Sequence, residues 1–120
     1  MRALLLGLLL AGTWCIQGRS PARRTYYDFL ATAFSRNGIT ADGIPSQVGI
    51  VAADPAVLPL GTRVRVSGAG MHSGIYTVRD TGSKVDGRHI DIYMPSRAAA
   101  KRFGKRRVRV TVLKWGDSKK

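Results

Sequence analysis

The chain has 120 residues, 20 Lys and Arg against 7 acidic residues, and a formal net charge of +13. This length allows one small domain and excludes a two-domain cofactor enzyme. The single Cys excludes an intrachain disulfide framework and a Cys-rich zinc site. With two His residues, no metal set of the usual spacing can be assembled, so we expect neither a metal nor another cofactor.

The N-terminal segment has the pattern of a secretory signal. A positive start is followed by an apolar run from Ala3 to Ile16, shorter than the roughly 20 residues of a membrane-spanning helix. Residues 17–21 are polar and include a Pro, so we expect a signal peptide over residues 1–18. This predicts export to the periplasm, cell envelope or extracellular space, with an uncleaved anchor as the alternative. Trp14 precedes Cys15 where a lipoprotein has a small residue, so lipidation is not expected.

The remaining chain is predicted to be mainly β. After a basic linker at 19–29, short β-type runs are separated by Gly, Pro, Asn and Asp. Six strands are expected, at 30–35, 48–53, 63–67, 75–79, 89–94 and 107–113. Ser96 as N-cap and Gly104 as stop predict one short helix between the last two strands. Six strands in about 90 residues predict a small closed barrel, because closure removes exposed edges. The domain is placed at 30–115, with a basic tail at 116–120.

The strand at 89–94 contains the most informative side chains. Period two turns Ile90 and Ile92 toward the core. The opposite face then carries His89, Asp91 and Tyr93. An Asp is unfavourable inside a β-branched strand, so it needs either a structural hydrogen bond or a role in a site. A carboxylate beside a tyrosine is a common arrangement for binding sugars, and the strand is therefore the leading candidate for a site.

Two further aspartates lie in turns. Asp80 opens an Asp-Thr-Gly sequence and Asp54 precedes Pro55. In such turns the carboxylate ordinarily accepts a hydrogen bond from the nearby backbone. Aspartic proteases also use Asp-Thr-Gly, but their fold needs two such motifs per active unit, and this chain has one. His72 lies in a glycine-rich loop and is expected to be solvated.

Basic residues gather near the C-terminus. Nine Lys and Arg occur from Lys101 to Lys120, against the single acid Asp117. Because Val and Arg alternate in the last strand, Arg107 and Arg109 are expected to point outward. Outside a cell such a surface suits anionic wall polymers, and the alternative is a solvated face that aids solubility. Nucleic acid is not expected, since aromatic residues for a stacking platform are missing.

Five motifs along residues 30–114 together carry a family resemblance. They are Thr-Ala-Phe-Ser at 32–35, Gly-Ile-Thr-Ala-Asp-Gly at 38–43, Ala-Asp-Pro at 53–55, Arg-Asp-Thr-Gly at 79–82 and His-Ile-Asp-Ile-Tyr at 89–93. In this combination the chain resembles the three-aspartate (3D) domain family. That family is related to the barrel of membrane-bound lytic transglycosylase A and to rare-lipoprotein-A-like barrels.

The resemblance implies a double-psi β-barrel that cleaves peptidoglycan glycan strands. Asp91 aligns with the catalytic acid and Asp80 with a supporting acid. Because the acid must start protonated, a raised pKa is required, and we expect the neighbouring carboxylate of Asp80 to raise it. The remaining residues implied near substrate are Thr40, Asp54, Thr81, His89 and Tyr93. The loop between the two acids departs from the family pattern, with Ser83 in place of Gly and Asp86 in place of Lys.

The implied reaction is that of a lytic transglycosylase. The acid protonates the glycosidic oxygen between N-acetylmuramic acid and N-acetylglucosamine, then accepts a proton from the C6 hydroxyl, which closes a 1,6-anhydro ring. One carboxyl group suffices because the nucleophile is tethered to the substrate. The alternative is a non-catalytic glycan-binding or wall-loosening module of the expansin or rare-lipoprotein-A type, in which Asp91 would be a sugar ligand.

Overall fold

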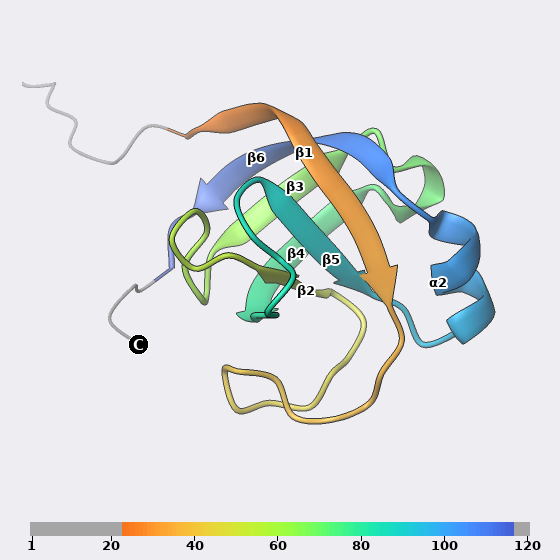
Figure 1. The fold of residues 1–120 in the computed structure, drawn as a ribbon. Helices are drawn as coiled ribbons and strands as arrows, with labels where there is room; N and C mark the ends of the chain where they lie inside the picture. Colours follow the sequence, from red (N-terminus) through yellow and green to blue (C-terminus); the bar gives the residue numbers. More distant parts are fainter. Residues whose placement is uncertain (1–22, 117–120) are drawn as a thin grey trace, which may run out of the picture.

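The structure, a computed structural model, describes residues 23–116. Its elements are β1 (Thr25–Phe34), β2 (Ile50–Ala53), β3 (Arg63–Ser67), the 3-10 turn η3 (Gly70–His72), β4 (Gly74–Asp80), β5 (His89–Tyr93), α2 (Arg97–Phe103) and β6 (Arg106–Lys114). The strands close into one barrel in the order β1-β5-β2-β4-β3-β6 (Figure 1). The predicted mainly β fold, a closed six-stranded barrel with one short α-helix, is confirmed.

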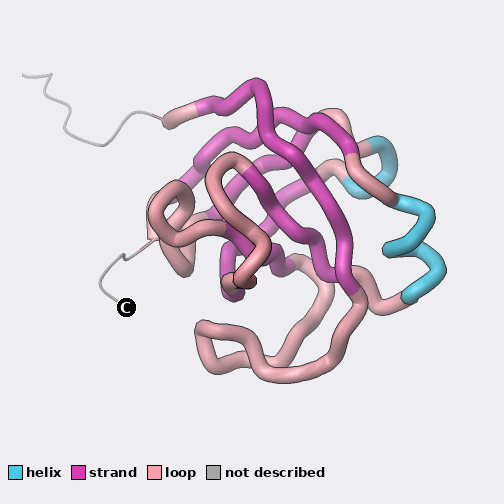
Figure 2. The backbone as a smooth tube through the Cα atoms, in the orientation of Figure 1, coloured by secondary structure: helices cyan, strands magenta, loops and turns pink. Residues whose placement is uncertain are grey.

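The pairing of the strands explains how distant segments meet. β1 pairs in parallel with β5, and β2 pairs in parallel with β4, whereas the other neighbours are antiparallel. These parallel pairs are compatible with the double-psi connection that the resemblance implies. Figure 2 shows the helical segments on one side of the barrel and the long loop between β1 and β2 below the strands. Among the described residues no helix is long and apolar enough to cross a bilayer.

The barrel interior is filled by β-branched side chains at alternating strand positions. Val64 and Val66 of β3 are fully buried, and the β6 valines face the same interior. The outward positions of β6 hold Arg107 and Arg109, which are exposed as expected. Each fully buried Val, Leu or Ile contributes about 1.5–3 kcal/mol relative to an exposed one, so the alternation determines which face of each strand turns inward.

The N-terminal boundary of the barrel differs from the prediction. β1 begins at Thr25, so residues 25–29 belong to the barrel and not to a linker. Tyr26 and Phe29 both lie in the core, with ring centroids 5.2 Å apart. A spacing of three would place them on opposite faces of a regular strand, and a register shift between them brings both inward. The expected signal, the start of the linker and residues 117–120 lie outside the described residues.

The helix forms as its end signals predict, and it covers a side chain that was expected to be solvated. The Ser96 hydroxyl oxygen accepts a hydrogen bond from the Ala99 backbone N–H at 3.1 Å, and Gly104 ends the helix at φ +65°. Phe103 of α2 is buried and meets the His72 ring edge to face, with centroids 5.5 Å apart. His72 is therefore partly buried against an aromatic ring, and the expectation of a solvated loop tip is wrong.

Candidate functional site

Asp91 lies at the middle of β5, on the outer side of the barrel. Its Cα partners are Thr32 on β1 and Ala52 on β2, and Ala52 pairs in turn with Asp80 on β4. Since Ile90 and Ile92 point inward, the Asp91 side chain points outward as predicted. Asp80 and Asp91 thus flank Ala52 two strand spacings apart, or about 10 Å between Cα atoms.

A small pocket joins the two carboxyl groups. Its volume is about 40 Å³, and its lining includes Phe34, Ala52, Asp80, Thr81 and Asp91. Such a space holds a few water molecules, whereas enclosed ligand sites occupy roughly 300–1,000 Å³. A ligand larger than a few atoms would therefore lie across this surface and not inside the pocket.

A hydrogen-bond chain leads from Asp91 to a histidine. The Thr32 hydroxyl donates to Asp91 Oδ1 at 2.8 Å, and Thr32 Oγ1 lies 2.8 Å from His89 Nε2. A hydroxyl carries one proton, so while Thr32 donates to the carboxylate its oxygen must accept from the imidazole. His89 then carries its proton on Nε2, and the ring stabilises the hydroxyl in the orientation that serves Asp91.

The pKa of Asp91 is raised above its ordinary value, and burial is the main cause. The hydrogen bond from Thr32 opposes this rise by favouring the charged form, as do the charges of His89 and Arg36. The negative charge of Asp80 raises the pKa and is the smallest of these effects. The expectation that Asp80 is the main cause is therefore wrong, because the carboxyl groups lie on strands separated by β2.

Asp80 connects the pocket to the long loop between β1 and β2. Its Oδ1 accepts two backbone hydrogen bonds, from Ala41 and Thr81, both at 2.9 Å. Beside it Arg79 pairs with Asp42 at 2.6 Å, and the Asp42 backbone N–H donates to the Arg79 carbonyl. Asp80 thus lines the pocket and also anchors the loop that borders it.

Asp54 has a different role from the other two aspartates of the motif set. One carboxylate oxygen accepts from the Ala56 backbone N–H at 3.0 Å, and the other accepts from Gly87 at 2.8 Å. These two bonds lower the pKa of Asp54, that from Gly87 contributing most. Asp54 does not line the pocket at Asp91. It braces the loop between β4 and β5.

Of the other residues expected near substrate, some lie at the pocket and others do not. Thr81 lines the pocket, and His89 reaches Asp91 through Thr32. Thr40 is 4% exposed, and its hydroxyl oxygen accepts from the Ile44 backbone within the long loop. Tyr93 was expected on the open face with Asp91.

Tyr93 is instead 8% exposed and packs edge to face on Phe34, with ring centroids 5.5 Å apart. Its hydroxyl donates to Asn37 at 3.3 Å. The ring therefore stabilises the end of β1, and no face of it is open for stacking a sugar.

Sequence reasoning did not assign a site role to Thr32 or Arg36. Both belong to the first strand or its exit, 55 to 59 residues before Asp91, and they reach it only because β1 and β5 pair in parallel. A polar Thr between Ala31 and Ala33 was the available signal. Among residues 23–116, no group of three metal-binding side chains could hold a metal ion.

Comparison with known proteins gives both a family and related folds. Residues 49–114 match the 3D domain family, which is more than half of the chain. The cell wall-binding protein YocH of Bacillus subtilis is 38% identical over 92 residues, covering 69% of this chain and 31% of YocH. The prophage-derived uncharacterized protein YorM of the same organism is 36% identical over 98 residues, covering 82% of this chain and 37% of YorM. The chain thus spans well under half the length of these relatives.

Solved structures of MltA, a lytic transglycosylase of E. coli, have a similar barrel. The MltA structure with bound chitohexaose superposes with a TM-score of 0.57 at 23% identity, over 68% of this chain and 29% of MltA. Another MltA structure gives a TM-score of 0.54 at 25% identity. The likeness in fold agrees with the sequence match, and the chain belongs to the 3D domain family.

Proposed function

We propose that this domain cleaves peptidoglycan glycan strands as a lytic transglycosylase, with Asp91 as its acid and base. The observation that carries the proposal is the half-buried Asp91 carboxyl group, with its raised pKa, on the outer side of the barrel. A carboxyl group whose pKa is raised retains its proton to higher pH than an ordinary Asp, which suits it to protonate a leaving oxygen. The similar barrel of MltA belongs to a lytic transglycosylase, and one MltA structure contains a sugar chain.

The reaction proceeds in two proton transfers. Asp91 donates its proton to the oxygen that leaves N-acetylmuramic acid, and the bond from that oxygen to C1 breaks. The carboxylate then accepts the proton of the C6 hydroxyl while the C6 oxygen bonds to C1, so Asp91 recovers its proton and no water is consumed. Between these steps the Thr32 hydroxyl donates to the carboxylate at Oδ1.

The substrate of this reaction lies outside the cytoplasm, so the proposal includes export of the protein by the signal expected at residues 1–18. The domain assignment that we propose is a barrel from residue 25 to about residue 115, preceded by that signal and a shorter basic linker.

The test is product analysis on isolated sacculi. Purified wild-type protein should release fragments that end in 1,6-anhydro-N-acetylmuramic acid, identified by mass spectrometry, and the Asp91→Asn variant should release none. Asn has the same shape and cannot carry the titrating proton. Fragments with an ordinary reducing end, or equal release by the variant, would contradict this assignment.

A second candidate function is glycan binding without cleavage. The small, open pocket favours it, because about 40 Å³ cannot enclose a sugar ring. The relative YocH is named as a cell wall-binding protein. In this case the same experiment gives sacculus binding and no products, and Asp91→Asn weakens binding.

We also propose that the arginine face, defined as Arg63, Arg65, Arg107 and Arg109, holds the protein to anionic wall polymers. The four exposed side chains lie on the paired strands β3 and β6, where Arg65 is opposite Thr111 and Ser67 is opposite Arg109. One acid, Asp28, pairs with Arg107 at 3.2 Å, and both groups are about 70% exposed. The face therefore remains strongly positive.

Binding through this face should weaken as salt rises. The Debye length falls from about 10 Å at 0.1 M to about 3 Å at 1 M ionic strength, which screens exposed charges. We expect sacculus binding to fall at least about tenfold over this range, measured by sedimentation, and the Arg65→Glu, Arg109→Glu double variant to bind weakly even at low salt. Sacculus binding that stays constant from about 0.1 M to about 1 M ionic strength would mean that the arginine face is only solvated and does not bind wall polymers.

A further inference from the structure

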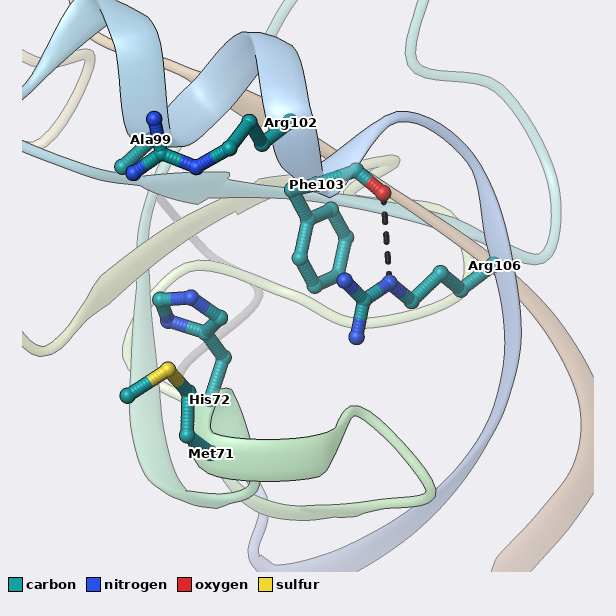
Figure 3. Close-up of a pocket in the computed structure, with 6 residues that line it drawn as sticks. All are labelled: Met71, His72, Ala99, Arg102, Phe103 and Arg106. Carbon is teal, nitrogen blue, oxygen red and sulfur yellow. Dashed lines mark hydrogen bonds between the residues drawn. The ribbon is translucent and has the colours of Figure 1, made fainter.

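A second and much larger hollow lies between η3 and α2. Its volume is about 660 Å³, within the range of small-ligand sites. It shares no lining residue with the pocket at Asp91, and Figure 3 shows its side chains. The lining residues are Met71, His72, Ala99, Arg102, Phe103 and Arg106.

The charge of this hollow is positive and has no local counter-charge. Arg102 and Arg106 both line it, and no acidic residue does. The ion pairs among residues 23–116 use other arginines, so neither guanidinium is paired with a carboxylate there. Guanidinium groups bind carboxylates through two parallel hydrogen bonds, so this lining suits an anionic group.

Arg106 is held in place before any ligand arrives. Its Nε donates to the Phe103 carbonyl at 3.2 Å and its Nη1 to the Ala69 carbonyl at 3.3 Å. The guanidinium lies 4.3 Å from the centre of the Phe103 ring. Figure 3 shows the two side chains next to each other. A Cβ on Gly70 would lie 3.3 Å from Nη1, so glycine leaves room for this group. The Nη2 group makes neither of these bonds, so its N–H donors can bind an anion. Because the Arg106 side chain is already held, little further side-chain entropy is lost when the anion binds.

The opposite wall is also fixed. The Tyr76 hydroxyl donates to the His72 carbonyl at 2.6 Å, and the Ser73 hydroxyl oxygen accepts from the Ala69 backbone at 2.9 Å. Met71 on this wall is 91% exposed. The Phe103 ring of α2 lies between His72 and Arg106 in Figure 3. The hollow thus combines two guanidinium groups, which lie on either side of the Phe103 ring in Figure 3, with an otherwise largely apolar lining.

We propose that this hollow binds the free C-terminal carboxylate of a short peptide with small apolar side chains. Peptidoglycan carries such an end, because its peptides terminate in D-alanine, and in that respect the inference rests on the proposed function. The carboxylate binds the fixed guanidinium of Arg106, Arg102 adds positive charge on the other side of the Phe103 ring, and the methyl groups lie against Met71 and Phe103. A phosphodiester polymer is polar along its length and would not use the apolar walls, so the peptide fits the lining better.

The test is an NMR titration of the folded protein with Lys-D-Ala-D-Ala. The Met71 methyl and the His72 and Phe103 ring signals should shift with the free acid, and the C-terminal amide should bind at least about tenfold more weakly. Equal binding of acid and amide would overturn the proposal. Tighter binding of glycerol phosphate at the same signals would overturn it too, since the hollow would then be a phosphate site.

Two charge reversals on α2 provide a matched comparison. Arg102→Glu should weaken binding of the free acid about tenfold, whereas Lys101→Glu should leave it within about twofold. Both residues are exposed and both changes alter the net charge equally, so only contact in the hollow separates them. Equal losses would overturn the proposal. Binding is measured without cleavage, and Asp91→Asn should bind the peptide as wild type does. Loss of glycan cleavage and loss of peptide binding are therefore separate results.

Discussion

Asp91 and Asp54 carry the same side chain, yet the fold moves their pKa values in opposite directions. Asp54 uses both oxygens to accept backbone N–H groups, which lowers its pKa. Asp91 accepts a single side-chain hydroxyl bond, and its burial outweighs that bond. Of the two, only Asp91 is adapted to retain a proton. Asp80 resembles Asp54 in accepting backbone N–H groups, although it borders the pocket.

The Asp91→Asn variant gives the sharpest test of this contrast between a proton-retaining Asp91 and a structural Asp54. Under the proposed function, glycan cleavage should fall by about 10²–10⁴-fold, the usual contribution of a general acid. Its raised pKa means that the folded state binds the proton more readily than the unfolded state, so the ionised form costs stability as pH rises through that value. The variant should therefore unfold at an equal or higher urea concentration at pH 7. A less stable variant would show that Asp91 is a structural residue.

Thr32→Val should produce the next largest effect. It removes the hydroxyl that favours the charged carboxylate, so the pKa of Asp91 rises further and the alkaline limb of the activity profile moves to higher pH. The maximal rate should fall about tenfold to a hundredfold, because a hydrogen bond to a charged group contributes about 1.5–3 kcal/mol. Thr32→Ser is the control, since it keeps the hydroxyl and should keep the wild-type profile.

Asp80→Ala tests the anchoring role of that residue. It removes the acceptor of two backbone hydrogen bonds, so the free energy of unfolding should fall by about 1–2 kcal/mol in urea titrations. Asp80→Asn keeps an acceptor oxygen and should lose less. Both changes remove a negative charge that raises the pKa of Asp91, so the alkaline limb should move slightly to lower pH. An unchanged pH profile of activity would mean that Asp80 only anchors the loop and does not influence Asp91.

The smallest effect is expected from Asp54→Asn, and it should depend on pH. The lowered pKa of Asp54 contributes stability that is present above its ordinary value and is lost as pH falls through the folded value. Asn offers one acceptor oxygen for the two N–H groups. The variant should thus be less stable than wild type at pH 7 and equal to it in strong acid, as thermal unfolding can measure. A constant difference at all pH values would contradict this role.

The parts of the fold that follow from local pattern were predictable. Alternation placed the β6 valines inside and their arginine neighbours outside, and it placed Asp91 on the outer face of β5. The bulge in β1 was not predictable, because Tyr26 and Phe29 break the period of two and only the closed core shows why both turn inward.

The environment of each candidate site residue depended on contacts distant in sequence. Tyr93 is on the expected strand, but Phe34 and Asn37 cover it. Thr40 is in the expected loop, where its hydroxyl is used internally. The pKa of Asp91 is raised mainly by burial, and the alternation of residues in a strand does not predict how deeply an outward side chain is buried. The hollow at Arg106 required η3 and α2 to meet.

The parallel pairing of β1 with β5 also has a consequence for the order of folding. Thr32 and Asp91 are 59 residues apart, and the floor between Asp91 and Asp80 comes from a third strand. Contacts with such separation form slowly, since the chain must close large loops before it gains their energy. A chain that has not yet closed its barrel therefore lacks the environment that retains the proton on Asp91. If the chain is exported unfolded, as the proposed function requires, the proposed acid at Asp91 would become active only after the barrel has closed outside the membrane.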